Sequence, residues 1–422
     1  MKLWRGIAAR LVLAVVLTAG LCTAGSSQTT LHILNGPVPY WVLKGTVPAT
    51  LDYNFAQGLY YQAGQARGLG SGSLTTTSRP SVKYCSYLSG LYVKVANNTL
   101  CVTNQGALIE EARTNDALWS RDMTQASWTL VGDTAALNAV GIDGNANSAT
   151  TLTATGTAGV CTASCTALQA ITLGSTADTY SVFLKRVTGT GTVNITINNL
   201  TGVTACTLTT TAFTRCSITA TLANPVIGIQ MTTVGDVIVA DFNQMEPGGF
   251  ATSPISTTNA AVARAADVVT VTNPLLFGSA YTLFAKGAPQ APMSYGTDQY
   301  ILSVDTGANA NRASLYRNSG GGNSTVLLEA SSSVIWNTTI SSWAQNALGR
   351  LSMGLAPGQH AASFNAGNPV TDATAGALPV PTTIHIGTGA PGNAWWNGYI
   401  SEIAIFANTA QPAAQLQAFG SR

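Results

Sequence analysis

Short segments with alternating apolar and polar residues recur along most of this chain, separated by turn residues at intervals of about eight to twelve positions. A period of two is typical of β-strands that bury one face. The sequence contains no heptad pattern, no long helical pattern and no repeat of fixed length. The pattern therefore predicts an all-β protein made of antiparallel β-sandwiches.

The segment 116–262 is predicted to form the first sandwich. Its strand candidates include TYSVFLKRVTG, TVNITINNL, ACTLTTTAF, TRCSITATL, VIGIQMTTVG and DVIVADFNQME. The last of these is apolar on both faces, with Val237 and Val239 on one face and Ile238 and Ala240 on the other. A strand that is apolar on both faces is expected in the centre of a sheet.

The segment 263–422 is predicted to form a second sandwich. Nine strand candidates run from DVVTVT to NGYISEIAIFAN, and a short helix, QPAAQLQAFG, follows them. Before the first sandwich, residues 26–115 form a small β-rich leader region with the strand candidates KYCSY, LYVKV and TLCVT. The sequence leaves open whether this region folds alone or packs on a neighbour.

Two segments mark the joints between these units, GALIEEARTN (106–115) and GGFATSPISTTNAAVARAADVVTVT (248–272). With the DALWSRDMTQASWTLVGD segment, they resemble phage tail-fibre-like and capsid-decorating modular proteins and their prophage or secreted relatives. The resemblance spans roughly residues 51–419. It implies a carbohydrate-binding-module-like jelly roll, a concanavalin A-like (laminin-G-like) lectin sandwich, and a homo-oligomer that recognises glycans or cell surfaces. Fold alone does not assign function.

The N-terminus predicts a signal peptide over residues 1–25. Lys2, Arg5 and Arg10 precede the twelve-residue apolar run Leu11–Cys22, which is shorter than the roughly 20 residues of a membrane-spanning helix. A lipid-modified Cys22 is the alternative. Because virion proteins normally assemble in the cytoplasm, the signal favours a secreted or surface-displayed relative, with a virion surface as the location if the protein is phage-derived. No later segment is apolar enough to span a membrane.

The composition excludes some classes of partner. Only 9% of the 422 residues are charged, against about 25% in ordinary proteins. Loss of the signal leaves 16 basic against 17 acidic residues, a net charge of −1. Because no run of Lys or Arg is present, we expect no binding to nucleic acid.

Six cysteines follow the signal, and an even number in an exported chain predicts disulfides. Cys206–Cys216 is expected to pair across a hairpin, and Cys161–Cys165 to close a small loop. Cys85–Cys101 is the least secure pair. If strand 91–95 lies between the strands of Cys85 and Cys101, the two cysteines are separated by two ladder spacings of about 4.8 Å each. That distance exceeds the Cα separation of about 7 Å that a disulfide usually allows. The alternative is free, buried thiols.

No catalytic motif is present around the three histidines, His32, His360 and His385. Glycoside hydrolases need two carboxylates about 5–9.5 Å apart, and no two acids of 263–422 are spaced as on the catalytic strand of concanavalin A-like glucanases. The sequence therefore predicts a protein without enzymatic activity. The alternatives are a polysaccharide hydrolase or lyase, and a purely structural decorating module without ligand.

Sugar binding requires aromatic faces and hydrogen-bonding groups. Trp336, Trp343, Trp395 and Trp396 are the candidate ligand-binding residues, and packing beneath a loop is the alternative for each. Trp128 matches a position that usually packs in the core of the related jelly rolls.

One oxygen-rich segment is a candidate site for a structural calcium ion, which the related jelly rolls often hold. Asp143, Asn145 and Asn147 offer oxygens at alternate positions. A turn built on Asp-Gly and Asn explains the same residues without a metal, and we favour the turn. No other cofactor is predicted.

Overall fold

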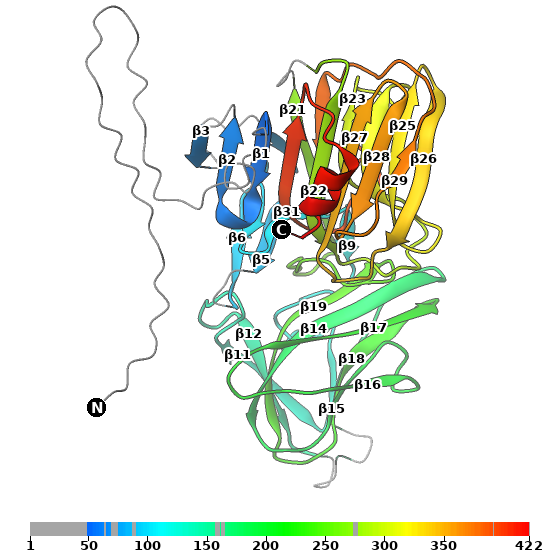
Figure 1. Ribbon diagram of the computed structural model, residues 1–422. Helices are drawn as coiled ribbons and strands as arrows, with labels where there is room; N and C mark the ends of the chain where they lie inside the picture. Colours follow the sequence, from blue (N-terminus) through cyan, green and yellow to red (C-terminus); the bar gives the residue numbers. More distant parts are fainter. Residues whose placement is uncertain are drawn as a thin grey trace, which may run out of the picture. The chain divides into compact units, whose positions relative to one another are not determined.

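The computed structural model describes residues 49–62, 65–68, 75–86, 90–156, 161, 165–272, 277–390 and 392–421. The predicted signal peptide, Cys22 and His32 lie outside these residues. Within them the chain forms two β-sandwiches, whose named ladders are all antiparallel (Figure 1). The described helices include none that is long and apolar enough to cross a membrane.

One sandwich is built from a ten-stranded and a seven-stranded sheet. The larger sheet has the order β29 (Val370–Asp372), β28 (Gln359–Phe364), β27 (Gly349–Ala356), β22 (Tyr281–Pro289), β31 (Gly398–Phe406), β1 (Leu51–Asn54), β2 (Leu59–Gln62) and β3 (Gln65–Gly68), while β8 (Gly106–Ile109) pairs with β31 and with β7 (Val102–Thr103). The smaller sheet has the order β26 (Ser333–Ser342), β25 (Asn323–Ala330), β24 (Arg312–Arg317), β23 (Gln299–Asp305), β30 (Thr383–Ile386), β21 (Val268–Thr272) and β4 (Thr75–Ser78). A 3-10 turn (Phe55–Gln57) follows β1, and helix α2 (Ala413–Phe419) ends the described chain.

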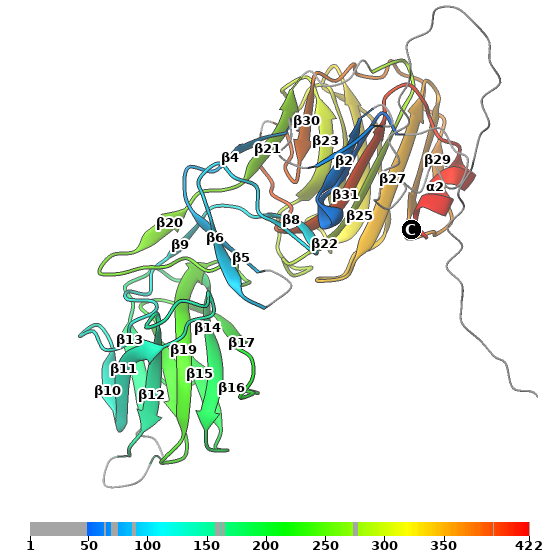
Figure 2. The same ribbon diagram turned by 90° about the vertical axis from the view of Figure 1, so that its left-hand side faces the viewer.

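The leader region does not form a unit of its own. Strands β1, β2, β3, β7 and β8 belong to the ten-stranded sheet, and β4 to the seven-stranded one. Figure 2 shows β4 beside β21. Leu51 and Tyr53 lie opposite Ile405 and Ile403 of β31, and all four side chains are fully buried. Without β1, one side of β31 would be a sheet edge. The strands from the start of the chain therefore pair its backbone groups and bury its apolar side chains.

The second sandwich comprises two five-stranded sheets. One has the order β10 (Thr129–Val131), β13 (Thr166–Ala170), β18 (Val226–Met231), β15 (Val193–Thr196) and β16 (Val203–Cys206); the other has the order β11 (Asp133–Ala139), β12 (Ala149–Ala154), β19 (Val237–Pro247), β14 (Thr176–Thr188) and β17 (Thr214–Leu222). Strand β19 is central, as its two apolar faces predicted. Trp128 lies in the core, 4% exposed.

The jelly roll is an insertion into the other sandwich. The chain enters it through β9 (Arg113–Asn115) and leaves through β20 (Val262–Arg264), and these two strands pair with each other. A hairpin of β5 (Lys83–Ser86) and β6 (Tyr92–Val95) packs on the jelly roll, with Tyr84 against Phe242 at 4.8 Å between ring centroids. The two joint segments recognised in the sequence therefore lie side by side.

The described strands that the sequence analysis did not name include β11, β13 and β26. Strand β26 is rich in Ser, Thr and Asn, and its side chains alternate weakly because it lies at the edge of its sheet. An edge strand buries less, so its sequence carries less of the apolar period.

All three predicted disulfides are present. Cys85 lies opposite Val93 of β6, yet Cys101 approaches it within 6.2 Å between Cα atoms. This is possible because β7 joins the ten-stranded sheet and does not extend the β5–β6 ladder. Cys206 and Cys216 do not face each other across a hairpin, since β16 and β17 are edges of opposite sheets. That disulfide therefore joins the two layers of the jelly roll.

Candidate functional site

The outer face of the seven-stranded sheet carries polar and aromatic side chains. In β23, Leu302 and Val304 point into the core, so Ser303 and Asp305 occupy the opposite face. The Ser303 hydroxyl lies 2.9 Å from that of Ser314, and Asp305 Oδ2 lies 2.8 Å from Nδ1 of His385. His385 lies between Ile384 and Ile386, which are both in the core, so its side chain is on the opposite face of the strand.

A cavity of about 430 Å³ opens at one end of this face. We call it the sheet-face groove. It is lined by Gly296, Thr297, Asp298, Tyr300, Asn309, Arg312, Ser319, Asn393 and Ala394. These residues come from β23, β24 and four loops, so segments far apart in the sequence meet there. Its wall combines amides, hydroxyls, a carboxylate and a guanidinium.

Arg312 is the best-fixed side chain of the groove. Its Nε donates to Glu329 Oε2 at 3.0 Å and its Nη1 donates to Asn309 Oδ1 at 2.7 Å. The guanidinium also lies 5.8 Å from the ring centroid of Tyr300, which stacks on Tyr316 at 4.9 Å. These contacts hold Arg312 in one orientation, so little side-chain entropy remains to be lost on binding a ligand. Nη2 is not engaged by any of them.

The rings of Tyr300 and Tyr316 support the groove and are not open platforms. They are 7% and 6% exposed, and Arg312 packs against the Tyr300 ring. Burial raises the pKa of the Tyr300 hydroxyl, so this group stays protonated and can donate a hydrogen bond at neutral pH. Recognition here would therefore use hydrogen bonds more than ring stacking.

The loops around the groove are also fixed. Asp298 Oδ1 accepts a hydrogen bond from the Ser319 backbone at 2.7 Å. Beneath them, Arg317 is fully buried and donates to the carbonyls of Ala291, Pro292 and Trp343. Burial lowers the pKa of Arg317 to about 10. A single buried cation thus ties together segments that carry groove residues.

The four predicted ligand-binding tryptophans do not form this site. Trp336, Trp343 and Trp396 are 6%, 1% and 0% exposed and belong to the core of the sandwich. Trp395 is half-buried and its Nε1 donates to the Asp267 carbonyl at 2.9 Å. Large apolar rings contribute most when they are buried, so the packing alternative describes the first three. None of the three presents a ring face to a sugar.

The Asp143 segment does not fit a calcium site. Both oxygens of Asp143 accept hydrogen bonds from Arg121, at 2.7 and 2.8 Å, and Asn145 N donates to Oδ1 as in an Asx turn. The Arg121 guanidinium, also paired with Asp241, takes the position a cation would need, and Asn147 adds no carboxylate. No cluster of three or more His, Cys, Asp or Glu residues suited to a metal occurs in the described ranges.

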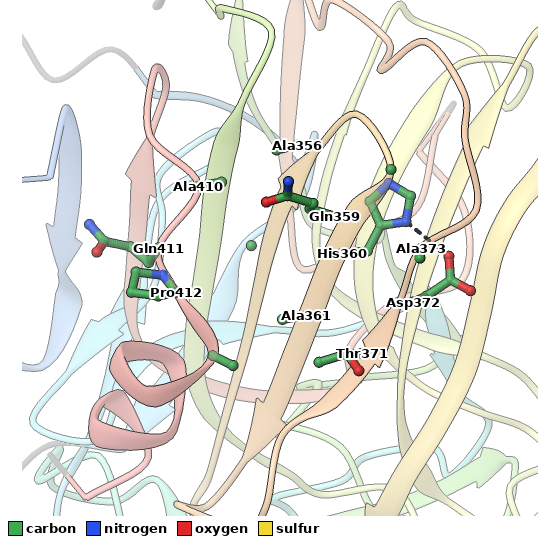
Figure 3. A pocket seen from close by; sticks show the side chains of 13 residues that line it. Ala356, Gln359, His360, Ala361, Thr371, Asp372, Ala373, Ala410, Gln411 and Pro412 are labelled. Carbon is green, nitrogen blue, oxygen red and sulfur yellow. Dashed lines mark hydrogen bonds and ion pairs between the residues drawn. The ribbon is translucent and has the colours of Figure 1, made fainter.

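A larger cavity of about 610 Å³ lies beside α2, on the ten-stranded sheet (Figure 3). Figure 3 shows Gln359 and Thr371 at its wall, while the amide of Gln411 extends away from β28. His360 and Asp372 are joined by a 3.0 Å contact, and His360 stacks on Trp336 in the core. The remaining lining is mostly Gly, Ala and Pro. This cavity offers few groups for specific recognition, so we favour the sheet-face groove.

The sequence analysis did not select Asp298, Asn309, Arg312 or Asn393. One signal was available, because the alternation in QYILSVD and ASLYRN places Tyr300 and Tyr316 near each other on the polar face of adjacent strands. The loop residues had no such signal, since their approach depends on the pairing of distant strands.

No protein-family model matches the sequence, and no curated protein matches it. Among solved structures, the chain is similar to the CBM40 module of a Ruminococcus gnavus IT-sialidase bound to α2,6-sialyllactose, at 13% identity over 35% of this chain and 84% of that one, with a TM-score of 0.29. A SAP-like pentraxin from Limulus polyphemus shares 19% identity over 35% of this chain and 72% of that one (TM-score 0.27). The NanB sialidase from Streptococcus pneumoniae shares 15% identity over 34% of this chain but 24% of that one (TM-score 0.29). At these TM-scores the similarities carry no argument about the ligand of this chain.

Proposed function

We propose that this protein is an exported glycan-binding protein without enzymatic activity, which recognises sugar hydroxyls in the sheet-face groove. The observation that carries the proposal is the groove itself, where Asp298, Asn309, Arg312 and Asn393 line one cavity. Carboxylate, amide and guanidinium groups together donate to and accept from vicinal hydroxyls. Arg312 is held by its neighbours before any ligand arrives.

The proposal of export rests on the cysteines and the predicted signal peptide. All six cysteines of the described chain are paired, in three disulfides. Disulfides persist in oxidising compartments and are rare in the cytosol. The disulfides support the proposal that the protein is secreted or surface-displayed, as expected from the resemblance to tail-fibre-like proteins.

The proposal of binding without catalysis rests on the carboxylates. Hydrolysis of a glycoside ordinarily needs two, and the described lining of the groove includes one, Asp298. Of the nearby acids, Glu329 pairs with Arg312 and Asp305 with His385. Both are engaged in contacts that would have to break before they could act on a substrate.

A glycan array probed with the secreted mature chain tests the function. We expect binding to a subset of glycans that weakens at least about tenfold in Arg312→Met, because a charge-assisted hydrogen bond contributes about 1.5–3 kcal/mol. Gln359→Ala, in the cavity beside α2, is the matched control and should bind as the parent does. Absence of binding to every glycan would favour a purely structural module, and release of reducing ends or unsaturated products would favour a hydrolase or lyase.

Homo-oligomerisation belongs to the same proposal. Linked copies raise the effective concentration of weak sites, so an oligomer would bind a surface far more tightly than one chain does. Light scattering coupled to size exclusion measures the state directly. A monomer would remove multivalency from the proposal but would leave binding at the groove intact.

A further inference from the structure

A lysine and an aspartate are in direct contact at the point where the jelly roll is inserted. Lys83 Nζ lies 2.6 Å from Asp267 Oδ2, although the two residues are 184 positions apart in the sequence. Glu110 Oε2 lies 2.9 Å from the same nitrogen. The three side chains are at most 1% exposed, so bulk water is excluded from the contact.

The charges around this contact are balanced. Among the described residues, the cations Lys83, Arg79, Arg264 and Arg113 pair with the carboxylates of Asp267, Glu110, Glu111 and Glu246. Condensation of one ammonium with one carboxylate removes one charge of each sign, so the remaining charges stay balanced. A buried ion pair also carries a desolvation cost, which a neutral amide largely avoids.

We propose that Lys83 and Asp267 form an intramolecular isopeptide bond, with Glu110 accepting and returning a proton. The two reacting groups are already at hydrogen-bond distance, so most of the entropy of bringing them together is lost during folding and not during the reaction. Exclusion of water also protects the product from hydrolysis. The bond is a covalent modification that the chain makes by itself.

The condensation needs no other reactant. A proton of the Lys83 ammonium moves to Oε2 of Glu110, and the freed electron pair of Nζ forms a bond to Cγ of Asp267. Oδ2 then takes that proton from Glu110 and a second proton from Nζ, and leaves as water. The amide keeps Oδ1 and one N–H, so both protons of the water come from the ammonium, and Glu110 returns to its ionised state.

Arg79 and Leu108 hold the reacting groups in place. Arg79 Nη1 donates to Oδ1 of Asp267 at 2.7 Å, while its Nε and Nη2 donate to the carbonyls of Ser81 and Ala96. Because Oδ1 gains negative charge when Cγ becomes tetrahedral, a fixed guanidinium at that oxygen stabilises the transition state. The Leu108 carbonyl accepts a hydrogen bond from Nζ at 2.9 Å, which orients the amine.

Glu110 is a weak base, and this makes the reaction slow. Burial alone would raise the pKa of Glu110, but Arg264, Lys83 and a hydrogen bond from Ser253 hold it far below its ordinary value. The contribution of Lys83 disappears as this residue gives up its proton. A slow reaction is sufficient, because each molecule forms the bond once.

The bond closes the chain around the inserted jelly roll. Lys83 begins β5, and Asp267 directly precedes β21, so the inserted sandwich lies between the two linked residues in the sequence. Unlike the disulfides, an amide is not opened by reduction. The site shares no residue with the lining of the sheet-face groove, so this inference is independent of glycan binding.

Peptide mapping of the exported mature chain tests the bond. After reduction of the disulfides and digestion with trypsin, we expect the peptide that spans Lys83 and the peptide 265–286 to be recovered as one species, lighter than their sum by one water. Cleavage after Lys83 should be blocked. Two separate peptides and complete cleavage after Lys83 would show an ion pair only and overturn the proposal.

Two matched variants test the role of Glu110. Glu110→Gln keeps both reacting groups but removes the proton acceptor, so the linked species should form at least about a hundredfold more slowly after synthesis. Glu111→Gln changes the neighbouring carboxylate, which pairs with Arg113, and should react as the parent does. Pairing of Cys85 with Cys101 in an unreduced digest shows that each variant has folded. An unchanged rate in folded Glu110→Gln would overturn the role of Glu110.

Discussion

Asp133 offers a sharp test of the energetics of the jelly roll. It begins β11, it is 7% exposed, and neither of its carboxylate oxygens has a hydrogen-bond partner. Burial raises its pKa from the ordinary 3.8 to about 7. An unpaired carboxylate in such a position destabilises the fold whenever it is ionised, so replacing it with neutral Asn should stabilise the protein at high pH.

The sign and size follow from proton linkage. Below pH 3.8 the carboxyl is protonated in both states and there is no penalty. Between pH 3.8 and about 7 the native state binds the proton more tightly, so stability falls by about 1.4 kcal/mol for each pH unit. Above pH 7 the loss is constant, at most about 4 kcal/mol. An Asn amide is as poorly satisfied as the neutral acid, so Asp133→Asn should recover about 2–4 kcal/mol at pH 8 and almost nothing at pH 4.

Urea denaturation at pH 4, 6 and 8 measures this difference, because the unfolding free energy extrapolates linearly with denaturant. The comparison is between parent and variant, so other titrating groups cancel. Asp122→Asn is the matched control in the same sandwich; its carboxylate accepts hydrogen bonds from Thr124 and Gln125, so that variant should not gain stability. Equal stability of parent and Asp133→Asn at pH 8 would refute the reasoning.

Three further predictions concern the contacts that hold the fold together. Arg317→Met should destabilise by about 3–5 kcal/mol, measured by denaturation, because it leaves several buried carbonyls without a donor. The double variant Cys206→Ser/Cys216→Ser should lose about 2–3 kcal/mol, since its disulfide closes a loop of sequence separation 10; a shift below 1 kcal/mol in reducing-agent-free denaturation would contradict this. Asn115→Ala should lose about 2–4 kcal/mol and speed proteolytic release of the jelly roll, because the Asn115 side chain bonds Asn243, Ile255, Ala117 and Met245; unchanged cleavage kinetics would argue against that role.

The EEARTN segment shows what a motif alone can and cannot predict. Its position marked the joint correctly, but its chemistry appears only in the fold. Glu110 forms a buried ion pair with Lys83, and Arg113 pairs with Glu111. The Asn115 side chain forms hydrogen bonds with four backbone groups, three of which belong to residues more than a hundred positions away in the sequence. These partners are distant in the chain, so no local pattern could identify them.

The sequence by itself determined the fold class, because the period of two and the spacing of turns are local consequences of the pleated backbone. It also predicted the central place of β19 and the three cysteine pairs, although Cys206–Cys216 joins two sheets and not the strands of a hairpin. Tertiary structure alone decided that β1 pairs with β31, that Trp343 and Trp396 are buried, and that Arg121 forms an ion pair with Asp143. The physical reason is that burial and ion pairing depend on neighbours brought together from distant segments, whereas strand formation depends mainly on the residues of the strand.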